Sequence, residues 1–383
     1  MKTLSDVCEV YSGYALKEFN EYGDGLPVVK IGNIMADGSL VLDNCQYTSE
    51  IVNAKYLSQK GDIYVALSGA TTGKIGILET DDTHVINQRV GIVRRTDDNV
   101  PYEYIKYFLL RQTERILKEA AGCAQPNISP KQIAAYEIPD ISKAKMLEES
   151  TILDSISSLI TQRKVELQRL DELIKARFVE MFGNVATGTY KYDTCKLGDV
   201  AEVGSSHRVF TSEFVEEGIP FYRGTEIGEL ANGQKPSNPY YISEDHYNRL
   251  ANDDTKPKIG DLLMPSICNK GQVWMVDTEE PFYYKDGRVL CISPNREIYD
   301  PRYLQYFMRA KTEVEYPKMG SGSTFAEFKI FLLKDFDVLT PPKEVQIMFS
   351  SFVEQVDKSK VTVKKALEES QMLFDSLMQE YFG

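Results

Sequence analysis

The stretch LSDVCEVYSG at residues 4–13 decides the fold, because it returns as LGDVAEVGSS at residues 197–206, 193 positions later. Three further pairs occur in the same order: LPVVKIGNI at Leu26 with IPFYRGTEI at Ile219, GDIYVAL at Gly61 with GDLLMPS at Gly260, and PYEYIKYFLL at Pro101 with DPRYLQYFMR at Asp300. The chain also ends on Phe382 and Gly383, which repeat Phe182 and Gly183 at an offset of 200. Five ordered matches with a slowly drifting offset indicate an internal duplication.

Each copy has the same internal order, a β-rich region followed by one long helix. Residues 85–95 (VINQRVGIVRR) alternate in polarity, which predicts a half-buried strand with Ile86, Val90 and Ile92 on its inner face. Residues 101–118 predict a helix, because a proline opens the segment and apolar residues then recur at helical spacing. The globular part of each copy is therefore expected to mix helix and sheet.

The long helical segments carry a second pattern. Residues 145–181 contain neither proline nor glycine, and apolar residues recur at spacings of three and four in both copies, which predicts coiled-coil seams. Polar residues interrupt the seams at different places, Arg163 and Arg177 in the first and Lys360 and Ser370 in the second. The seam residues are Leu153, Ile156, Ile160, Leu167, Leu170, Ile174, Met181, Val353, Val356, Val363, Leu367, Phe374, Leu377 and Tyr381. The two helices suit pairing with one another; the alternative is that each lies alone on its own domain.

The order of the segments decides the direction of such a pair. The first long helix leads from unit one to unit two and the second can only return, so paired helices must be antiparallel. The expected fold class is α+β, with two duplicated mixed α/β domains joined by two long antiparallel coiled-coil helices in a pseudo-two-fold dumbbell. Forty helical residues at 1.5 Å each give a shaft of ~60 Å. The expected segments are residues 1–143, 144–184, 185–342 and 343–383.

Composition narrows the class of protein. A chain of 383 residues suggests two or three domains, and no run of eighteen apolar residues predicts a membrane span. The N-terminus lacks the apolar core of a signal peptide, so the expected location is the cytoplasm. Six cysteines and three histidines are scattered singly, which argues against disulfides, a zinc ribbon or another metal site.

Two motifs point towards catalysis and fail on inspection. The Gly69–Gly73 loop lacks the spacing of a phosphate-binding loop and the hydroxyl residue after Lys74, so it is expected to be a turn between strands. The Asn-Pro-Tyr-Tyr run at Asn238 is similar to an amino-methyltransferase motif, but the other copy has Cys45 and Gln46 in its place. No catalytic constellation recurs in both copies, so the sequence predicts no enzyme.

Two related domains at a set separation suit duplex DNA, whose helical repeat makes half-site spacing rigid. Several motifs of this sequence also resemble those of a known family. The L-[SG]-D-V-x-E-V opening, the Gly-Asp strand, the Gly73-Lys74 turn, the AGCAQPNIS run before Ile138-Pro139 and the long helix resemble specificity subunits of Type I restriction–modification systems. The likeness spans essentially the whole chain, twice.

That resemblance implies a host-defence role in which each globular unit is a target recognition domain for one half of a bipartite DNA site. It also implies two modification (methyltransferase) subunits as partners, and restriction subunits in the full complex. Those subunits would bind S-adenosylmethionine, ATP and Mg, leaving this chain without a cofactor or catalytic residues. The sequence departs from the pattern in GSGSTF at residues 320–325, and all four segments are acidic, with net charges of −4, −1, −6 and −2.

Comparison of the copies selects candidate DNA contacts. Arg89 and Arg288 align on equivalent predicted strands and are read as phosphate contacts, with structural salt bridges as the alternative. Exposed positions that differ between the copies are better candidates for reading bases. These are Lys30, Asn33, Ser68, Thr71, Thr72 and Lys74 in the first copy and Arg223, Thr225, Asn269, Lys270 and Gln272 in the second.

Two other functions stay open at this stage. The chain contains 23 tyrosines, which suit interfaces in general, so a non-enzymatic scaffold that binds two proteins is the main alternative. A degenerate methyltransferase is the third, and binding of S-adenosylmethionine by the isolated chain would support it.

Overall fold

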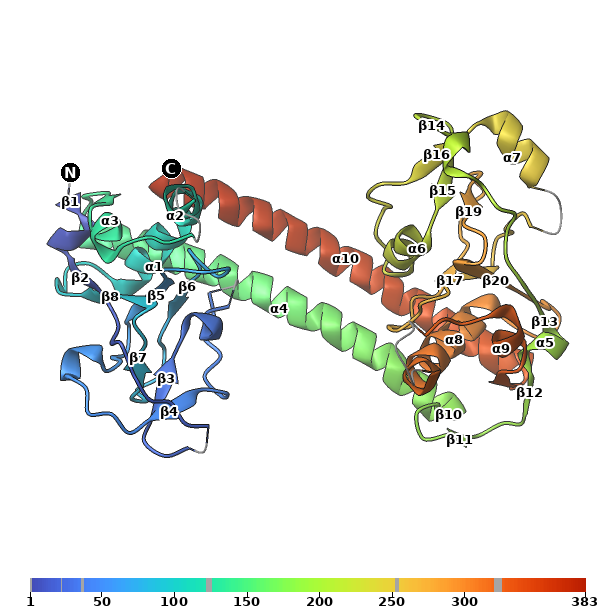
Figure 1. Ribbon diagram of the computed structural model, residues 1–383, viewed down its shortest axis with the longest axis horizontal. Coiled ribbons are helices and arrows are strands. Elements are labelled where there is room, and N and C mark those ends of the chain that lie inside the picture. The colour runs from blue at the N-terminus through green and yellow to red at the C-terminus, as the bar shows by residue number, and fades with distance from the viewer. Residues whose placement is uncertain (1, 22, 36–37, 122–125, 252–254, 320–325) are drawn as a thin grey trace. The chain divides into compact units, whose positions relative to one another are not determined.

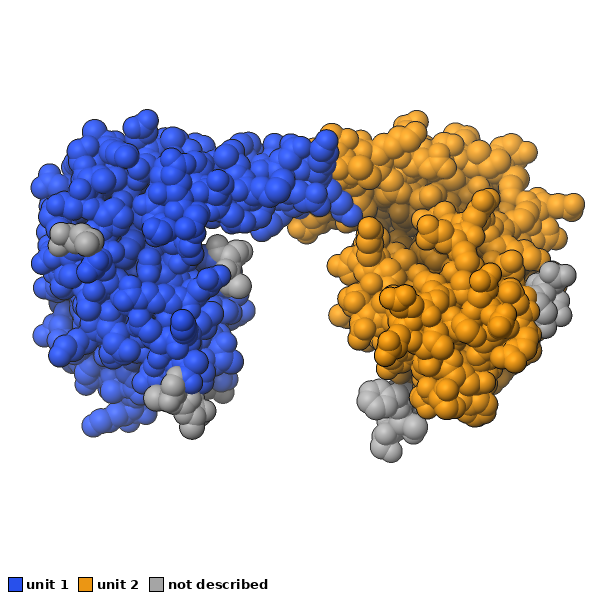
Figure 2. All heavy atoms as spheres, turned by 90° about the horizontal axis from the view of Figure 1, so that it is seen from above, with its two compact units in different colours: residues 1–165, 364–383 blue, residues 166–363 orange. Residues whose placement is uncertain are grey.

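The computed structural model describes residues 2–21, 23–35, 38–121, 126–251, 255–319 and 326–383. The chain forms two compact units, coloured separately in Figure 2. Unit 1 comprises residues 1–165 and 364–383, and unit 2 comprises residues 166–363. Each of the two long helices, α4 (Lys143–Phe182) and α10 (Lys343–Phe382), therefore contributes to both units.

Unit 1 is built on two small sheets (Figure 1). The first is antiparallel, in the order β2 (Cys8–Ser12), β8 (Val90–Arg95), β5 (Ile63–Ala66) and β6 (Ile75–Ile77). The second has the order β4 (Gln46–Thr48), β3 (Leu26–Val29) and β7 (Val85–Ile86), with β3 and β7 parallel. A pair of β1 (Lys2–Thr3) and β9 (Glu137–Ile138) closes the unit, together with α1 (Tyr102–Arg111), α2 (Thr113–Ala120) and α3 (Pro130–Ala134).

Two predicted elements of unit 1 are divided in the structure. Residues 85–95 form two strands in different sheets, because the chain turns at residues 87–89. The prediction of a half-buried strand was also wrong, since Val93 is as buried as Ile92 in the interior strand β8. The helix predicted over residues 101–118 is broken at Gln112 into α1 and α2.

Unit 2 repeats this frame. The sheet β13 (Ala201–Gly204), β20 (Val289–Pro294), β17 (Leu262–Pro265) and β18 (Trp274–Met275) has the order of the first sheet of unit 1. The other sheet has the order β14 (Phe214–Val215), β16 (Tyr240–Ile242), β15 (Ile219–Tyr222) and β19 (Tyr283–Tyr284). Two antiparallel pairs complete the strands: β10 (Gly183–Asn184) with β11 (Thr189–Tyr190), and β12 (Thr194–Lys196) with β21 (Asp337–Leu339), which is remote in sequence.

The helices of unit 2 begin at residues that suit helix starts. In α8 (Pro301–Glu315) the Asp300 side chain accepts from the first backbone N–H groups, and in α7 (Glu244–Leu250) the Ser243 hydroxyl does the same. The remaining helices are α5 (Leu197–Val200), α6 (Gly224–Ala231) and α9 (Ile330–Lys334). Single turns of 3-10 helix are η1 (Leu4–Asp6), η2 (Ile31–Asn33), η3 (Ala54–Tyr56), η4 (Thr211–Glu213) and η5 (Tyr316–Met319).

Each unit's core takes the beginning of one long helix and the end of the other. Met146 and Leu153 of α4 lie in the core of unit 1 together with Met378 and Phe382 of α10. The core of unit 2 instead contains Phe178 and Phe182 of α4 with Phe349 and Val353 of α10. The helices are thus parts of the globular cores as well as of a seam.

The helix pairs run antiparallel within each unit, as predicted, and the alternative of two solitary helices is wrong. In unit 2 Asp171 contacts Lys360, Arg177 contacts Phe352 and Phe178 contacts Phe349. Residue numbers therefore rise along α4 where they fall along α10, which makes the two helices antiparallel. Three of the four polar interruptions, Arg163, Ser370 and Lys360, form hydrogen bonds across the seam. Arg163 donates to the Ser370 hydroxyl and the Ala366 carbonyl in unit 1, and Lys360 bonds to Asp171 at 2.5 Å in unit 2.

Several predicted features lie outside the described residues: residues 122–125 of the AGCAQPNIS run, with Cys123 among them, and the GSGSTF run at residues 320–325. The five cysteines that the structure does describe are unpaired. Over the described ranges, no helix has the length and apolarity needed to cross a membrane.

Candidate nucleic-acid interface

Three segments meet at equivalent places in the two units. In unit 1 they are the loop at residues 67–74, the turn at residues 87–89 and the segment at residues 126–129; in unit 2 they are residues 266–272, 285–288 and 326–329. Leu67 N–H donates to the Arg89 carbonyl at 2.9 Å, and Ile128 N–H donates to the Leu67 carbonyl at 2.9 Å. Ser266 N–H donates to the Arg288 carbonyl at 2.9 Å and Phe328 N–H to the Ser266 carbonyl at 2.7 Å. Backbone hydrogen bonds therefore hold the same three-part site in both units.

The loop of unit 1 is a glycine turn between β5 and β6, as predicted. Gly73 has a φ of 81°, a left-handed conformation that favours glycine, and a Cβ there would lie 3.3 Å from Ile116. The Thr72 hydroxyl donates to the Gly69 carbonyl at 2.6 Å, and its residue is 6% exposed. Because that hydroxyl is used inside the turn, Thr72 is not retained as a base contact.

The other loop residues differ in accessibility. Ser68 and Lys74 are half-buried, and Ser68 pairs with Asn127 through an isolated β-bridge. The Thr71 hydroxyl is buried without a hydrogen-bond partner among the described residues, which leaves it the least suited of the three to reach a ligand. No ion pair of the Lys74 ammonium is found within the described part of the chain. Lys74 is therefore the strongest remaining candidate in this loop.

Lys30 and Asn33 lie in the turn after β3, where both side chains have local partners. The Asn33 amide accepts from Lys30 N–H at 2.7 Å and donates to the Val41 carbonyl at 2.9 Å. The Lys30 ammonium lies 3.7 Å from the centre of the Phe19 ring and also donates to Gln46. Burial lowers the pKa of Lys30. These residues shape the turn, so a DNA contact by either one requires that a local contact be given up.

Arg223 comes directly after β15, and its side chain makes several local contacts. Its guanidinium donates to Glu226, which is 1% exposed, and lies 4.3 Å from the centre of the Tyr240 ring. The hydrogen bond with Glu226 raises the pKa of Arg223. Thr225, in contrast, is exposed on the first turn of α6. The structure thus assigns Arg223 a role in holding α6, while Thr225 stays available to a ligand.

The loop of unit 2 presents more of its predicted residues. Asn269 and Lys270 are exposed, and Gln272 is half-buried. The Gln272 side chain accepts from Lys270 N–H at 3.0 Å and donates to the Asn269 side-chain oxygen at 3.4 Å. These contacts stabilise the loop and leave the Lys270 ammonium without an ion pair in the described ranges.

The two aligned arginines lie in turns between strands, and not on strands as predicted. Arg89 is exposed and forms no ion pair with any described residue. Arg288 instead pairs with Glu327, whose other oxygen accepts from Lys329 at 2.8 Å. The salt-bridge alternative therefore holds for Arg288 alone. Sequence comparison set GSGSTF opposite the run that contains Asn127, and therefore missed Glu327, which the structure places at the position equivalent to Asn127.

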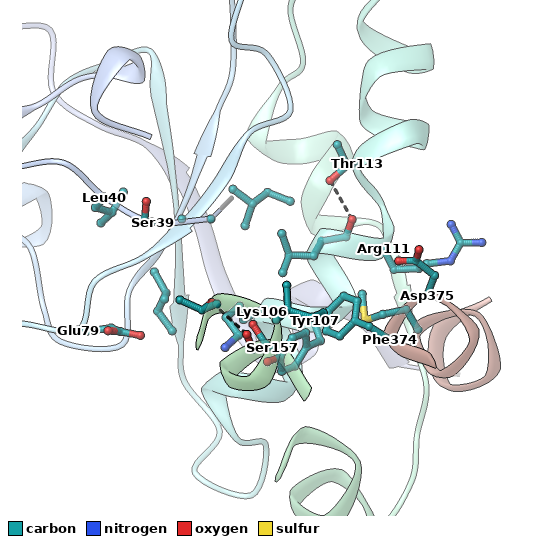
Figure 3. Close-up of a pocket in the computed structure, with 18 of the residues that line it drawn as sticks. Ser39, Leu40, Glu79, Lys106, Tyr107, Arg111, Thr113, Ser157, Phe374 and Asp375 are labelled. Carbon is teal, nitrogen blue, oxygen red and sulfur yellow. Dashed lines mark hydrogen bonds between the residues drawn. The ribbon is translucent and has the colours of Figure 1, made fainter. Parts of the chain in front are cut away.

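Unit 1 also has a groove of about 1200 Å³, whose lining includes Ile75 and Gly76, directly after the 67–74 loop. Figure 3 shows Ser39, Leu40 and Glu79 on one side of it and Arg111, Phe374 and Asp375 on the other. The charged lining is balanced, with Glu79, Glu114 and Asp375 against Lys106, Arg111 and Lys164. In unit 2 the equivalent of Leu110 is Arg309, which bonds to the Ala231 carbonyl at 2.6 Å and ties α6 across this region. No described group of His, Cys, Asp and Glu side chains is arranged to hold a metal ion.

Comparison with known families and structures gives concordant matches. A family model described as Type I restriction modification DNA specificity domain matches residues 1–173 and again residues 190–370. The S subunit of a Type I restriction–modification system from M. genitalium has a similar structure, with a TM-score of 0.58 and 15% identity, over 100% of this chain and 95% of that chain. A structure described by the complex assembly and conformational transition of the type I R-M system matches with a TM-score of 0.60 and 16% identity, over 100% and 96%. The family match and these similar folds confirm the predicted fold class.

Proposed function

The chain belongs to the family of Type I restriction–modification DNA specificity domains, and we propose that each of its two units reads one half of a bipartite DNA site. The observation that carries this proposal is the repeated three-part site, which equivalent backbone hydrogen bonds hold in both units, and most of whose accessible side chains differ between the units. Shared backbone suits a common way of docking, and divergent side chains suit different base sequences.

The residues proposed to approach DNA are exposed or half-buried candidates on these segments and on α6, among which Asn269 and Gln272 also share a hydrogen bond at 3.4 Å. Lys74 and Arg89 serve unit 1, with Ser68 beside them, and Thr225, Asn269, Lys270 and Gln272 serve unit 2. Arginine and lysine are the side chains that most often contact guanine or phosphate, and asparagine and glutamine suit adenine. Lys30, Asn33 and Arg223 are proposed to support the turns that present these residues.

The chemistry is proposed to reside in partners. Two modification subunits would supply S-adenosylmethionine and methylate adenine, and restriction subunits would add cleavage driven by ATP with Mg, in the cytoplasm. This chain would then direct the complex without catalysing a reaction. An acidic chain with a net charge of −13 gains affinity for DNA when basic partners share the contact.

Exchange of residues 1–143 for the same region of a relative tests the bipartite proposal. The hybrid, produced with the modification subunits, should methylate a site in which one half is new and the other unchanged, as read by methylome sequencing. Change in both halves, or in neither, would show that the units do not read independently. Saturable binding of S-adenosylmethionine to the isolated chain would favour the degenerate methyltransferase instead.

The long helices are further proposed to set the spacer between the half-sites. Adding one heptad after Gln168 and another after Glu368 keeps the apolar register. Seven residues add ~10 Å, and DNA rises ~3.4 Å per base pair. The methylated site should then keep both halves and gain roughly three base pairs of spacer. An unaltered spacer in a folded double insertion would refute this part of the proposal.

A further inference from the structure

We propose that Glu327 competes with DNA phosphates for the cations of unit 2, and so lowers the affinity of that unit for DNA of any sequence. This inference rests on the proposed function and concerns how the two units divide the electrostatic part of binding. It starts from differences in charge between two segments that are held in equivalent places. Segment 126–129 has the neutral Asn127 where segment 326–329 has Glu327.

The contacts of Glu327 occupy both of its oxygens. One oxygen pairs with the Arg288 guanidinium and the other accepts from the Lys329 ammonium at 2.8 Å. The Glu327 side chain is 17% exposed, whereas those of Arg288 and Lys329 are each 54% exposed. The carboxylate therefore lies beneath two accessible cations and draws both of them towards the protein.

Unit 1 has neither the carboxylate nor the second cation. Arg89 is exposed, and Asn127 and Ser129 replace Glu327 and Lys329 at the equivalent positions. The sum of these charges is +1 in both sites. Unit 1 has the single cation Arg89, and unit 2 has two cations, Arg288 and Lys329, with the carboxylate Glu327. What differs is the freedom of the cations. A phosphate can bind Arg89 directly, whereas at Arg288 it meets a guanidinium that is already paired with Glu327.

The competition weakens binding to DNA of every sequence, and base contacts decide how far that loss is offset. A carboxylate left near a phosphate is repelled, and that repulsion applies to every DNA sequence because the backbone is uniform. Favourable base contacts at a cognate half-site can offset it, whereas a non-cognate sequence offers none. Glu327 would thus make unit 2 the more selective of the two units, and unit 1 the stronger non-specific anchor.

Salt titration of DNA binding measures this difference. Each phosphate contact changes the slope of log K against log salt by about 0.9. The full chain, in complex with its co-expressed modification subunits, is titrated with a labelled non-cognate duplex between 50 and 200 mM salt, roughly the range over which phosphate contacts dominate. Arg89→Ala should reduce the slope by about one. Arg288→Ala should leave it nearly unchanged.

The reciprocal exchange is the decisive pair. Glu327→Gln should tighten non-cognate binding roughly tenfold and steepen the slope by one to two, roughly one for each released cation. Asn127→Glu should do the opposite in unit 1, weakening binding roughly tenfold and reducing the slope by about one. Glu368→Gln, an exposed position on α10, makes the same change in net charge and should have little effect. If Glu327→Gln reduces folding, as judged by its melting curve, Asn127→Glu carries the test.

The outcomes separate this inference from the proposed function. Absence of DNA binding by the wild-type complex would overturn the proposed function itself. Normal binding with wild-type salt slopes in both Glu327→Gln and Asn127→Glu would overturn only the competition. Loss of discrimination at a single base position in Glu327→Gln, without tighter non-cognate binding, would also overturn it and make Glu327 a base-reading residue.

Discussion

Units 1 and 2 keep the same strands and differ in the segments that connect and cover those strands. After β3 the chain makes only the single turn η2, whereas after β15 it forms the two-turn helix α6. Helix α6 packs through Ile227 and Ala231 against Trp274. The equivalent of Trp274 is Gly76, over which Leu40 lies so closely that a Cβ would fall 2.6 Å from its side chain. The frame is therefore shared, while the segments that cover it have diverged.

The long helices have not diverged in this way, since their C-terminal ends make equivalent contacts in the two units. Phe382 packs against Tyr104 at 4.9 Å between ring centres, and Phe182 packs against Tyr303 at 4.6 Å. Tyr104 of α1 and Tyr303 of α8 are equivalent positions in the repeat, so the last phenylalanine of each long helix packs against the same tyrosine position. The two units therefore differ in the segments that cover their sheets, and they are alike where the ends of α4 and α10 complete the two cores.

The largest effect is expected from removing those rings. Phe382→Ala should lower the free energy of unfolding by about 3–4 kcal/mol, because a large buried ring leaves a cavity. Hydrogen exchange should show the loss of protection in residues 1–165 of unit 1, although the substituted residue is at the far end of the sequence. Phe182→Ala should place a similar loss in unit 2. Loosening of only the last helical turn in either variant would show that the ends do not belong to the cores.

The loops should respond separately. Lys74→Ala is expected to weaken binding to cognate DNA by about 1–3 kcal/mol and to relax only the half-site of unit 1. Lys270→Ala should act in the same way on the other half-site. Competition binding with duplexes altered in one half at a time measures both effects. Thr72→Val serves as the control for unit 1, since its hydroxyl lies inside the turn; a wild-type result for Lys74→Ala would make this loop purely structural.

The two polar contacts of the helix seam should differ in strength. Arg163 is half-buried and its partner Ser370 is 8% exposed, whereas Asp171 is 57% exposed beside Lys360. A double-mutant cycle of Arg163→Ala with Ser370→Ala should give a coupling of about 1–2 kcal/mol, and one of Lys360→Ala with Asp171→Ala about 0.5 kcal/mol. Equal couplings in urea unfolding would show that burial does not decide the strength of these contacts.

A gain in stability is expected at Glu149, which is 6% exposed where unit 2 has Phe349. Burial raises the pKa of Glu149, and one of its oxygens has no hydrogen-bond partner among the described residues. A raised folded-state pKa means that ionisation costs more in the folded state, so stability should increase as pH falls through the folded-state pKa. Glu149→Leu should stabilise the chain by about 1 kcal/mol at neutral pH and remove that part of the pH dependence, as thermal unfolding at several pH values would show.

Sequence alone determined the duplication, the mixture of helix and sheet, and the antiparallel direction of the long helices. These depend on order and period, which are properties of the chain: five matches recur in register, and a helix that leaves one unit can only return to it. The glycine turn at residues 69–73 was equally predictable, because spacing alone excluded a phosphate-binding loop.

Tertiary structure decided which polar side chains remain free. Asn33, Thr72 and Arg223 look as available in the sequence as Lys74, yet backbone and side-chain partners occupy them. Arg89 and Arg288 occupy equivalent positions in the repeat, and only the folded chain brings Glu327, 39 residues further along, to one of them. Such pairings depend on distances between segments remote in sequence. A pattern within one segment therefore carries no record of them.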